Sequence, residues 1–256
     1  ATLQELGDIV SGGTPKTSDP ANFDGDIPWI TPADLTGYNE KTISRGRRNL
    51  TKKGLASSSA RVLPRRSVVF SSRAPIGYVA IAGSELATNQ GFKSVVVNKE
   101  VDENFVYFYL KSAKRLAEEN ASGTTFKEIS GSRFAQLPIP VAPTNEQRRI
   151  VEKIETLFAR LDQGEAALRH TQTLLARYRQ SVLKAAVTGA LTADWRAANA
   201  HRLEHGRDLL ARILQTRRET WQGRGKYKEP AAPDTTDLPE LPEGWVWASF
   251  DQLFHV

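Results

Sequence analysis

Apolar residues recur with heptad spacing between Thr144 and Gly189, and this pattern predicts one long helix over 144–189. With Ile154 at heptad position a, Gln147 opens the a series, and the predicted pairing residues are Ile150, Ile154, Leu157, Leu161, Leu168, Leu175, Tyr178 and Val182. The other faces carry Glu, Lys, Arg and Gln, so this seam is suited to a partner helix. Thr144 or Asn145 is expected to cap the start of the helix, and Gly189 its end. At 1.5 Å per residue the helix would be roughly 65 Å long.

The middle of this seam is weak, because Gly164 and Thr171 fall at d positions. We therefore expect an antiparallel pair or bundle that is thin or bent at its middle. The alternative is an ordinary helix that faces the core of a larger domain.

Residues 1–143 have the pattern of one compact mixed domain. Short β-branched and aromatic runs predict strands at 27–30, 67–72, 77–83 and 92–98, and also at 137–141. A helical stripe predicts a helix over 104–120. The predicted fold class is thus α/β (α+β), a mixed domain followed by long antiparallel coiled-coil-like helices.

Three further segments follow the long helix. Residues 190–222 predict a second helical segment, placed antiparallel to part of the first helix, and 223–242 form a linker rich in Pro and charge. His201 and His205 have metal-ligand spacing but lack a third ligand, so no metal site is predicted. Residues 243–256 are apolar again, and FDQLFHV aligns with LQELGDIV near the N-terminus. We interpret this segment as the start of an incomplete second copy of the first domain.

Composition narrows the functional classes. The chain has 35 basic and 29 acidic residues and a net charge of +6, which suggests an anionic partner. The absence of Cys excludes disulfides, thiolate zinc sites and cysteine catalysis. No apolar run approaches the length of a membrane span, so we expect a cytoplasmic protein without a membrane partner. Because the sequence contains no Met, we expect either a processed chain or a fragment.

A basic segment without any acidic residue lies between Lys41 and Arg73. Cations beside Ser, Thr and Asn are what phosphate contact requires, although a solvated basic face is the alternative. The amides of Asn89 and Gln90 have the chemistry to read adenine, or to bond the loop backbone instead. With the neighbouring loops, the predicted DNA-binding residues are Thr14, Lys16, Thr17, Arg45, Arg47, Arg48, Lys52, Lys53, Arg61, Ser72, Arg73, Asn89, Gln90, Lys93, Thr124 and Lys127.

The sequence does not predict catalysis. GGTP at 12–15 lacks the Gly-Lys-Ser/Thr of a phosphate loop. The closest approach to an adenine methyltransferase tetrapeptide is DPANF at 19–23, which lacks the second Pro and is interpreted as a turn. No paired-acid nuclease site stands out.

Several segments, in their order along the chain, resemble the specificity subunit of type I restriction–modification enzymes. They are LGDIVSGGTPKT (6–17), IPWITPADL (27–35), VVFSSRAPIGYVAI (68–81), ATNQGFKSVVVN (87–98), the stretch 122–155, GALTADWR (189–196) and the stretch 226–253. The stretch from 122 to 155, which joins domain and helix, is the most specific of them.

The resemblance implies that 1–143 is a target-recognition domain for one half of a bipartite site in double-stranded DNA. It implies that 144–189 is a spacer helix that docks modification (methyltransferase) subunits and, through them, the restriction subunit. S-adenosylmethionine, ATP and Mg are then expected on those partners, with no cofactor and no catalysis in this chain. The second recognition domain is missing, so we expect either a fragment or a half-length subunit that forms a homodimer. The alternatives are a coiled-coil adaptor whose basic domain binds nucleic acid non-specifically or protein, and a fused methylase–specificity protein cut short.

Overall fold

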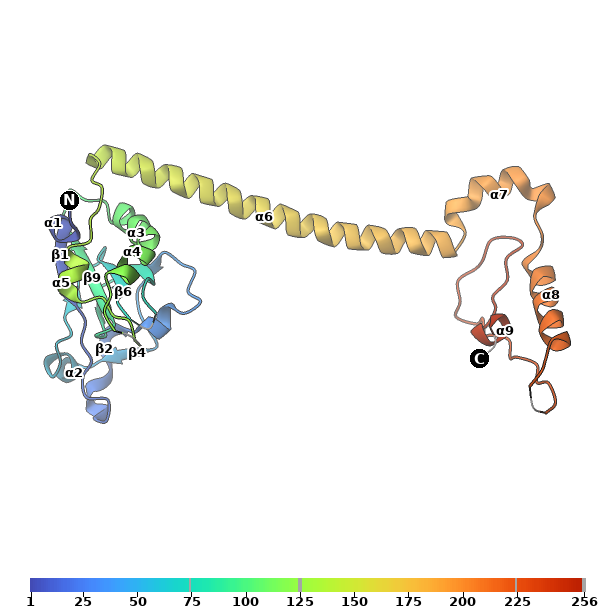
Figure 1. The fold of residues 1–256 in the computed structure, drawn as a ribbon, viewed down its shortest axis with the longest axis horizontal. Helices are drawn as coiled ribbons and strands as arrows, with labels where there is room; N and C mark the ends of the chain where they lie inside the picture. The colour runs from blue at the N-terminus through green and yellow to red at the C-terminus, as the bar shows by residue number, and fades with distance from the viewer. Residues whose placement is uncertain (74, 124–125, 224, 255–256) are drawn as a thin grey trace. The chain divides into compact units, whose positions relative to one another are not determined.

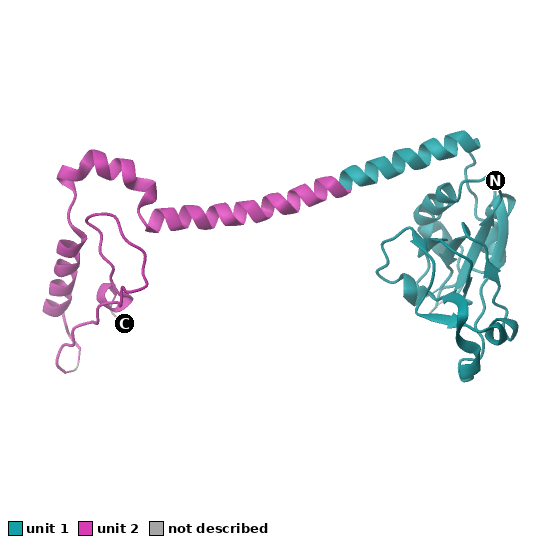
Figure 2. Ribbon diagram, turned by 180° about the vertical axis from the view of Figure 1, so that it is seen from behind, with its two compact units in different colours: residues 1–161 teal, residues 162–256 magenta. Residues whose placement is uncertain are grey.

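The computed structural model describes residues 1–73, 75–123, 126–223 and 225–254 (Figure 1). It contains two compact units, residues 1–161 and residues 162–256 (Figure 2).

The first unit is built on two sheets. The five-stranded sheet has the order β1-β9-β6-β7-β3, with bounds Gly7–Ser11, Phe92–Val97, Val68–Ser71, Val79–Ala82 and Thr42–Ile43. The four-stranded sheet has the order β4-β2-β8-β5, with bounds Arg48–Leu50, Phe23–Ile30, Leu86–Thr88 and Val62–Leu63. β1 and β6 both run antiparallel to β9, whereas β2 and β8 run parallel to each other.

Helices cover the first sheet and complete its core. α3 (Glu103–Ser112) packs on β6 and β7 and buries Val106 and Leu110, and Figure 1 shows it near β6. α4 (Lys114–Glu119) follows α3 and contributes Ala117 to the same core. The same core takes side chains from α1 (Leu3–Leu6) and α5 (Gly131–Ala135). Short helices η1 (Pro20–Asn22), η2 (Pro32–Leu35) and α2 (Lys52–Ala56) lie in the connections of the second sheet.

The four strands predicted from 27 to 98 are confirmed as parts of β2, β6, β7 and β9. The strand predicted at 137–141 is wrong. Within it only Pro138 forms an isolated bridge, to Thr2, because Pro138 and Pro140 lack a backbone N–H donor. Leu137 and Ile139 are buried in the core instead. The single helix predicted over 104–120 is also wrong, since Ala113 separates α3 from α4.

The long helix is confirmed as α6 (Thr144–Val187), a single helix of 44 residues. Gly189 adopts the left-handed conformation expected after its end, with φ of 78°. The expected N-cap is wrong: Thr144 and Asn145 already lie in the first turn, and the Thr144 hydroxyl donates to the Glu100 carbonyl.

Gln147 faces the domain, although the heptad placed it in the seam. Its amide donates to the Ala142 carbonyl at 2.8 Å and accepts from the Asp102 N–H at 3.0 Å, and the residue is 2% exposed. Val151, one turn later, is also buried. The first turns of α6 are therefore fixed to the domain by a polar contact that an apolar periodicity does not register.

The second unit contains the rest of α6 and a set of short helices. They are η3 (Ala190–Thr192), α7 (Ala193–Asn199), η4 (Ala200–Arg202), α8 (Gly206–Glu219) and α9 (Phe250–Leu253). The helical segment predicted over 190–222 is therefore interrupted, because His205 caps α8 by accepting from the Arg207 N–H. The expected antiparallel packing along α6 is absent from the described part of this unit, where every side chain from 162 to 181 is exposed.

α1 and α9 have the same local structure. Each has four residues and a capping box, in which Glu5 accepts from the Thr2 N–H at 2.6 Å and Gln252 accepts from the Ser249 N–H at 2.9 Å. Their burial differs, since Leu3 of α1 is 0% exposed whereas its counterpart in α9, Phe250, is 80% exposed. The two segments that the sequence aligned thus fold alike locally, and only the first is covered by a core.

Candidate nucleic-acid interface

Sheet topology gathers several loops of the first unit at one edge. β1 and β6 end where β9 begins, and β8 ends just before β9. The Gly13 N–H donates to the Thr88 carbonyl at 2.9 Å, and the Ser72 N–H donates to the Gly91 carbonyl at 2.7 Å. We call residues 12–17, 72–73, 89–93 and 126–130 together the loop edge.

The backbones at the loop edge approach so closely that only glycine fits at two positions. A Cβ at Gly12 would lie 1.9 Å from the Asn89 carbonyl oxygen, and one at Gly13 would lie 2.2 Å from the Ala60 nitrogen. The buried Trp29 indole donates to the Gly13 carbonyl at 3.1 Å. The segment GGTP, whose sequence does not match a phosphate loop, thus allows the backbones of the two sheets to pack closely together.

The structure brings the predicted residues Thr14 and Gln90 into side-chain hydrogen-bond contact. Of the two alternatives for Asn89, the structure shows a bond to the loop backbone, because its Oδ1 accepts from the Gly91 N–H at 2.9 Å. Gln90 is exposed, so its amide is the more accessible of the two.

Three charged side chains meet at the loop edge. Glu128 lies 3.2 Å from Arg73 and 3.5 Å from Lys93, and Lys93 is 7% exposed. The buried hydroxyl of Ser72 has no hydrogen-bond partner among the described residues. The site therefore holds two cations and one anion beside an unsatisfied polar group.

The basic segment 41–73 does not form one acid-free surface in space. Acidic residues remote in sequence pair with half of its cations, as Lys41–Glu155, Arg47–Asp34, Lys53–Asp19, Arg66–Glu103 and Arg73–Glu128. A hydrogen bond from Lys53, and then one from the Ala21 N–H, lowers the pKa of Asp19. Hydrogen bonding to Glu103 raises the pKa of Arg66. Lys41 faces α6, and Arg66 lies at the start of β6, away from the loop edge.

The other predicted cations are exposed. Those without a carboxylate within 4.0 Å among the described residues include Lys16, Arg45, Arg48, Lys52, Arg61 and Lys127. Arg61 follows Ala60, whose backbone touches Gly13, so it adjoins the loop edge. Arg48 lies over the Phe23 ring at 3.7 Å. Thr17 is exposed, and Thr124 lies outside the described residues.

Sequence reasoning missed three residues of this region. Glu128 joins Arg73 to Lys93, and Asp34 accepts from the Arg47 N–H at 3.1 Å and so holds the loop of Arg45 and Arg47. Phe126 is 79% exposed beside Lys127. An aromatic residue in an otherwise polar loop was the signal available for Phe126, whereas the acids are revealed only by the fold.

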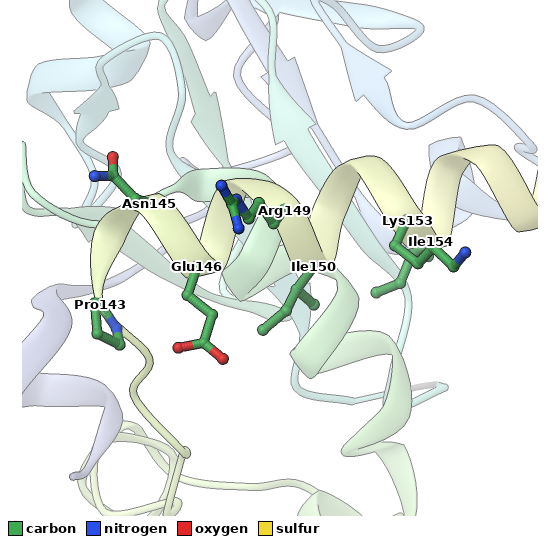
Figure 3. A pocket seen from close by; sticks show the side chains of 7 residues that line it. All are labelled: Pro143, Asn145, Glu146, Arg149, Ile150, Lys153 and Ile154. Atoms are coloured by element: carbon green, nitrogen blue, oxygen red, sulfur yellow. The ribbon is translucent and has the colours of Figure 1, made fainter.

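The predicted helix-pairing residues form a second exposed surface. Leu157, Leu161, Leu168, Leu175 and Tyr178 are 44%, 66%, 67%, 51% and 67% exposed, while Ile150, Ile154 and Val182 are half-buried. A groove lies at the start of this seam, with Pro143, Ile150 and Ile154 as its apolar lining and Glu146, Arg149 and Lys153 as charged neighbours (Figure 3). The described residues of this chain leave the seam exposed from Leu157 to Tyr178.

No described helix is both long and apolar enough for a membrane span. The described residues also contain no group of three His, Cys, Asp or Glu side chains that fits a metal ion. His201 and His205 are therefore not joined by a third ligand within that part of the chain.

The chain is similar to known proteins over this region. A family profile described as "Type I restriction modification DNA specificity domain" matches residues 1–168. The MjaIX type I restriction enzyme specificity subunit of Methanocaldococcus jannaschii is 40% identical over 151 residues, which cover 58% of this chain and 35% of that protein. The EcoDI specificity subunit of Escherichia coli is 28% identical over 153 residues, which cover 60% of this chain and 30% of that protein. The chain thus spans about a third of the length of these relatives.

Two solved structures share the fold. One, described as showing complex assembly and conformational transition of the type I R-M system, has a TM-score of 0.56 and 23% identity, covering 73% of this chain and 44% of its own. The other, the HsdS subunit from Thermoanaerobacter tengcongensis, has a TM-score of 0.54 and 21% identity with the same coverage. At these identities the likeness supports the architecture of a mixed α+β domain followed by a long helix.

Proposed function

Because the chain belongs to the family of type I restriction modification DNA specificity domains, we propose that it is a non-catalytic DNA-recognition subunit of a type I restriction–modification complex. It reads one half of a bipartite site in double-stranded DNA with the domain 1–143, and it docks modification subunits through α6. The observation that carries the proposal is that a cationic loop edge and an uncovered apolar helix seam occur in one chain of this family.

The chemistry of the loop edge supports DNA reading. Exposed cations such as Lys16 on the loop edge and Arg61 next to it can neutralise phosphates, which supplies affinity without sequence preference. The Gln90 amide offers a donor and an acceptor to a base edge, which supplies discrimination. The close approach of Gly12 to Asn89 and of Gly13 to Ala60 packs the backbone tightly next to these residues.

The seam supports docking through helix pairing. Leucines at heptad spacing that stay about half or more exposed in the described chain gain free energy when a partner helix covers them. In the complex the restriction subunit binds through the modification subunits, and S-adenosylmethionine, ATP and Mg belong to those partners. A second copy of this chain is another partner for the seam, and two identical domains would then read an inverted repeat. The capping-box likeness of α9 to α1 supports the interpretation of 243–256 as the start of a second recognition domain. The proposed site of action is the cytoplasm.

A binding selection tests the proposal directly. The full chain is incubated with a random duplex library at about 150 mM salt, where purely phosphate-driven binding is weakened. The selection is run with the chain alone and with a modification subunit. Enrichment of one short half-site, or of its inverted repeat at a fixed spacing, is the expected result. Retention of DNA without sequence enrichment under both conditions would favour the adaptor function instead.

A further inference from the structure

One carboxylate, that of Glu128, links three segments of the loop edge through Arg73 and Lys93. Arg73 follows β6, Lys93 lies in β9, and Glu128 belongs to the segment between α4 and α5. The Glu128 backbone is fixed on both sides, since its N–H donates to the Ser122 carbonyl at 2.9 Å and the following Ile129 N–H donates to the Ser72 carbonyl at 3.1 Å. The carboxylate is therefore held between the two cations by a rigid main chain.

Lys93 is a buried cation with too few partners. Its ammonium has three N–H donors, but the described residues offer only the Gln90 carbonyl and a Glu128 carboxylate oxygen, each at 3.5 Å. Buried charges are normally paired and fully hydrogen-bonded. Ser72, the residue before Arg73, has a buried hydroxyl that finds no hydrogen-bond partner among the described residues. The site thus offers more donors than the protein itself satisfies.

We propose that Glu128 occupies, in the DNA-free protein, the position at which Arg73 and Lys93 hold a backbone phosphate of the duplex. This inference rests on the proposed function and assigns a mechanism to its loop edge. A phosphodiester carries the same single negative charge as the carboxylate and presents two non-bridging oxygens to the same donors. The Glu128 side chain is 35% exposed, so it can rotate outward while its backbone stays in place. Phosphate then replaces carboxylate between the same two cations.

The exchange makes Glu128 a positioning residue that restrains non-specific binding. An arbitrary duplex must compete with the carboxylate for Arg73 and Lys93. A duplex whose bases fit the loop edge gains additional contacts that offset the exchange. Removing the negative charge at 128 should therefore strengthen binding to unrelated sequences more than binding to the selected sequence.

The test compares Glu128→Gln with Glu103→Gln in the full chain. Both substitutions remove one carboxylate from an arginine pair and raise the net charge equally, but Glu103 pairs with Arg66, away from the loop edge. Fluorescence anisotropy measures Kd for an unrelated duplex across a salt series. We expect E128Q to bind about 3- to 10-fold more tightly than the wild type near 100 mM salt, with a slope of log K against log salt steeper by about 0.9. E103Q should match the wild type, and Arg73→Gln in the E128Q background should abolish the gain.

The outcomes separate the two proposals. If the wild type binds duplex DNA and E128Q binds no more tightly than E103Q, Glu128 is a structural ion-pair partner and the phosphate placement is wrong. If no variant binds duplex DNA, either alone or with a modification subunit, the DNA-recognition function itself fails. Thermal melting checks that E128Q is folded. Should it unfold, Glu128→Asp retracts the carboxylate by one methylene; a gain smaller than expected for E128Q supports the exchange, and no gain overturns it.

Discussion

The ion pairs divide the basic segment into cations that can reach DNA and cations that are already engaged elsewhere. Arg61 is exposed, lies beside the loop edge and has no carboxylate within 4.0 Å in the described chain. Arg66, only five residues later, pairs with Glu103 at 2.7 Å. We predict that Arg61→Ala weakens DNA binding whereas Arg66→Ala leaves it unchanged, although both remove one arginine from the same acid-free stretch of sequence.

The magnitude follows from counterion release. Each phosphate contact contributes about 0.9 to the slope of log K against log salt. Over a fourfold rise in salt, one contact therefore accounts for about a 3.5-fold loss of affinity. Arg61→Ala should lower the slope by about 0.9 for every duplex sequence, because a phosphate contact carries no base preference.

The assay is an anisotropy titration of one selected and one unrelated duplex at four salt concentrations from about 50 to 200 mM. Lys41→Ala is a second control, because Lys41 pairs with Glu155 on α6. Equal slope reductions in the Arg61, Arg66 and Lys41 variants would show that charge alone matters, and would refute the reasoning from ion-pair geometry. A loss confined to the selected duplex in Arg61→Ala would instead identify Arg61 as a base contact.

Three further predictions concern pairing, stability and pH. Leu168→Glu should weaken association with a helical partner about 10- to 100-fold, since covering one leucine contributes about 1.5–3 kcal/mol to binding. The melting temperature of the isolated chain should stay unchanged. Analytical ultracentrifugation with the modification subunit measures the change in affinity. Leu3→Ala should lower the free energy of unfolding by about 2–5 kcal/mol because Leu3 is 0% exposed, whereas Phe250→Ala in the matching helix should have little effect, as measured by denaturant titration. Lys53→Ala should raise the pKa of Asp19 toward its ordinary 3.8 in an NMR titration, because the hydrogen bond from Lys53 lowers that pKa. The contribution of this pair to folding stability is present above pH 3.8 and is lost as the pH falls through the lowered pKa of Asp19. An unchanged pKa of Asp19 in the variant would contradict this assignment.

The sequence predicts those elements whose residue pattern is contained within one continuous stretch and repeats over many positions. α6, a helix of 44 residues, is found because apolar residues repeat at heptad spacing from Ile150 to Val182. β6, β7 and β9 are found because β-branched runs lie between turn residues. The strands β3 and β5 have two residues each, so they are defined by their partners and not by their own pattern. The segment 137–141 shows the converse, because its apolar residues pack in the core while its prolines prevent a ladder.

The predicted site residues also divide into those with a local sequence signal and those whose role is set by partners distant in sequence. Thr14 and Gln90 are 76 positions apart and were chosen separately, and the fold joins them through the meeting of β1 and β9. Glu128 and Asp34 were not predicted from the sequence, because their roles depend on cationic partners that only the fold brings near them. The basic segment was judged by its lack of local acids, which says nothing of Glu103 or Glu155.

The start of α6 connects the two proposed activities within the first unit. Gln147 is hydrogen-bonded to Asp102 and Ala142, and Glu155 pairs with Lys41, so one face of the helix is fixed to the domain 1–143. Ile150 and Ile154 lie between these residues in sequence and line the groove next to that face of the helix. The direction of the seam is therefore set by hydrogen bonds of the domain that bears the loop edge. A partner helix that docks on Ile150 and Ile154 acquires a fixed orientation toward that domain, which is what a subunit needs if it is to hold an enzyme at a set distance from the sequence it reads.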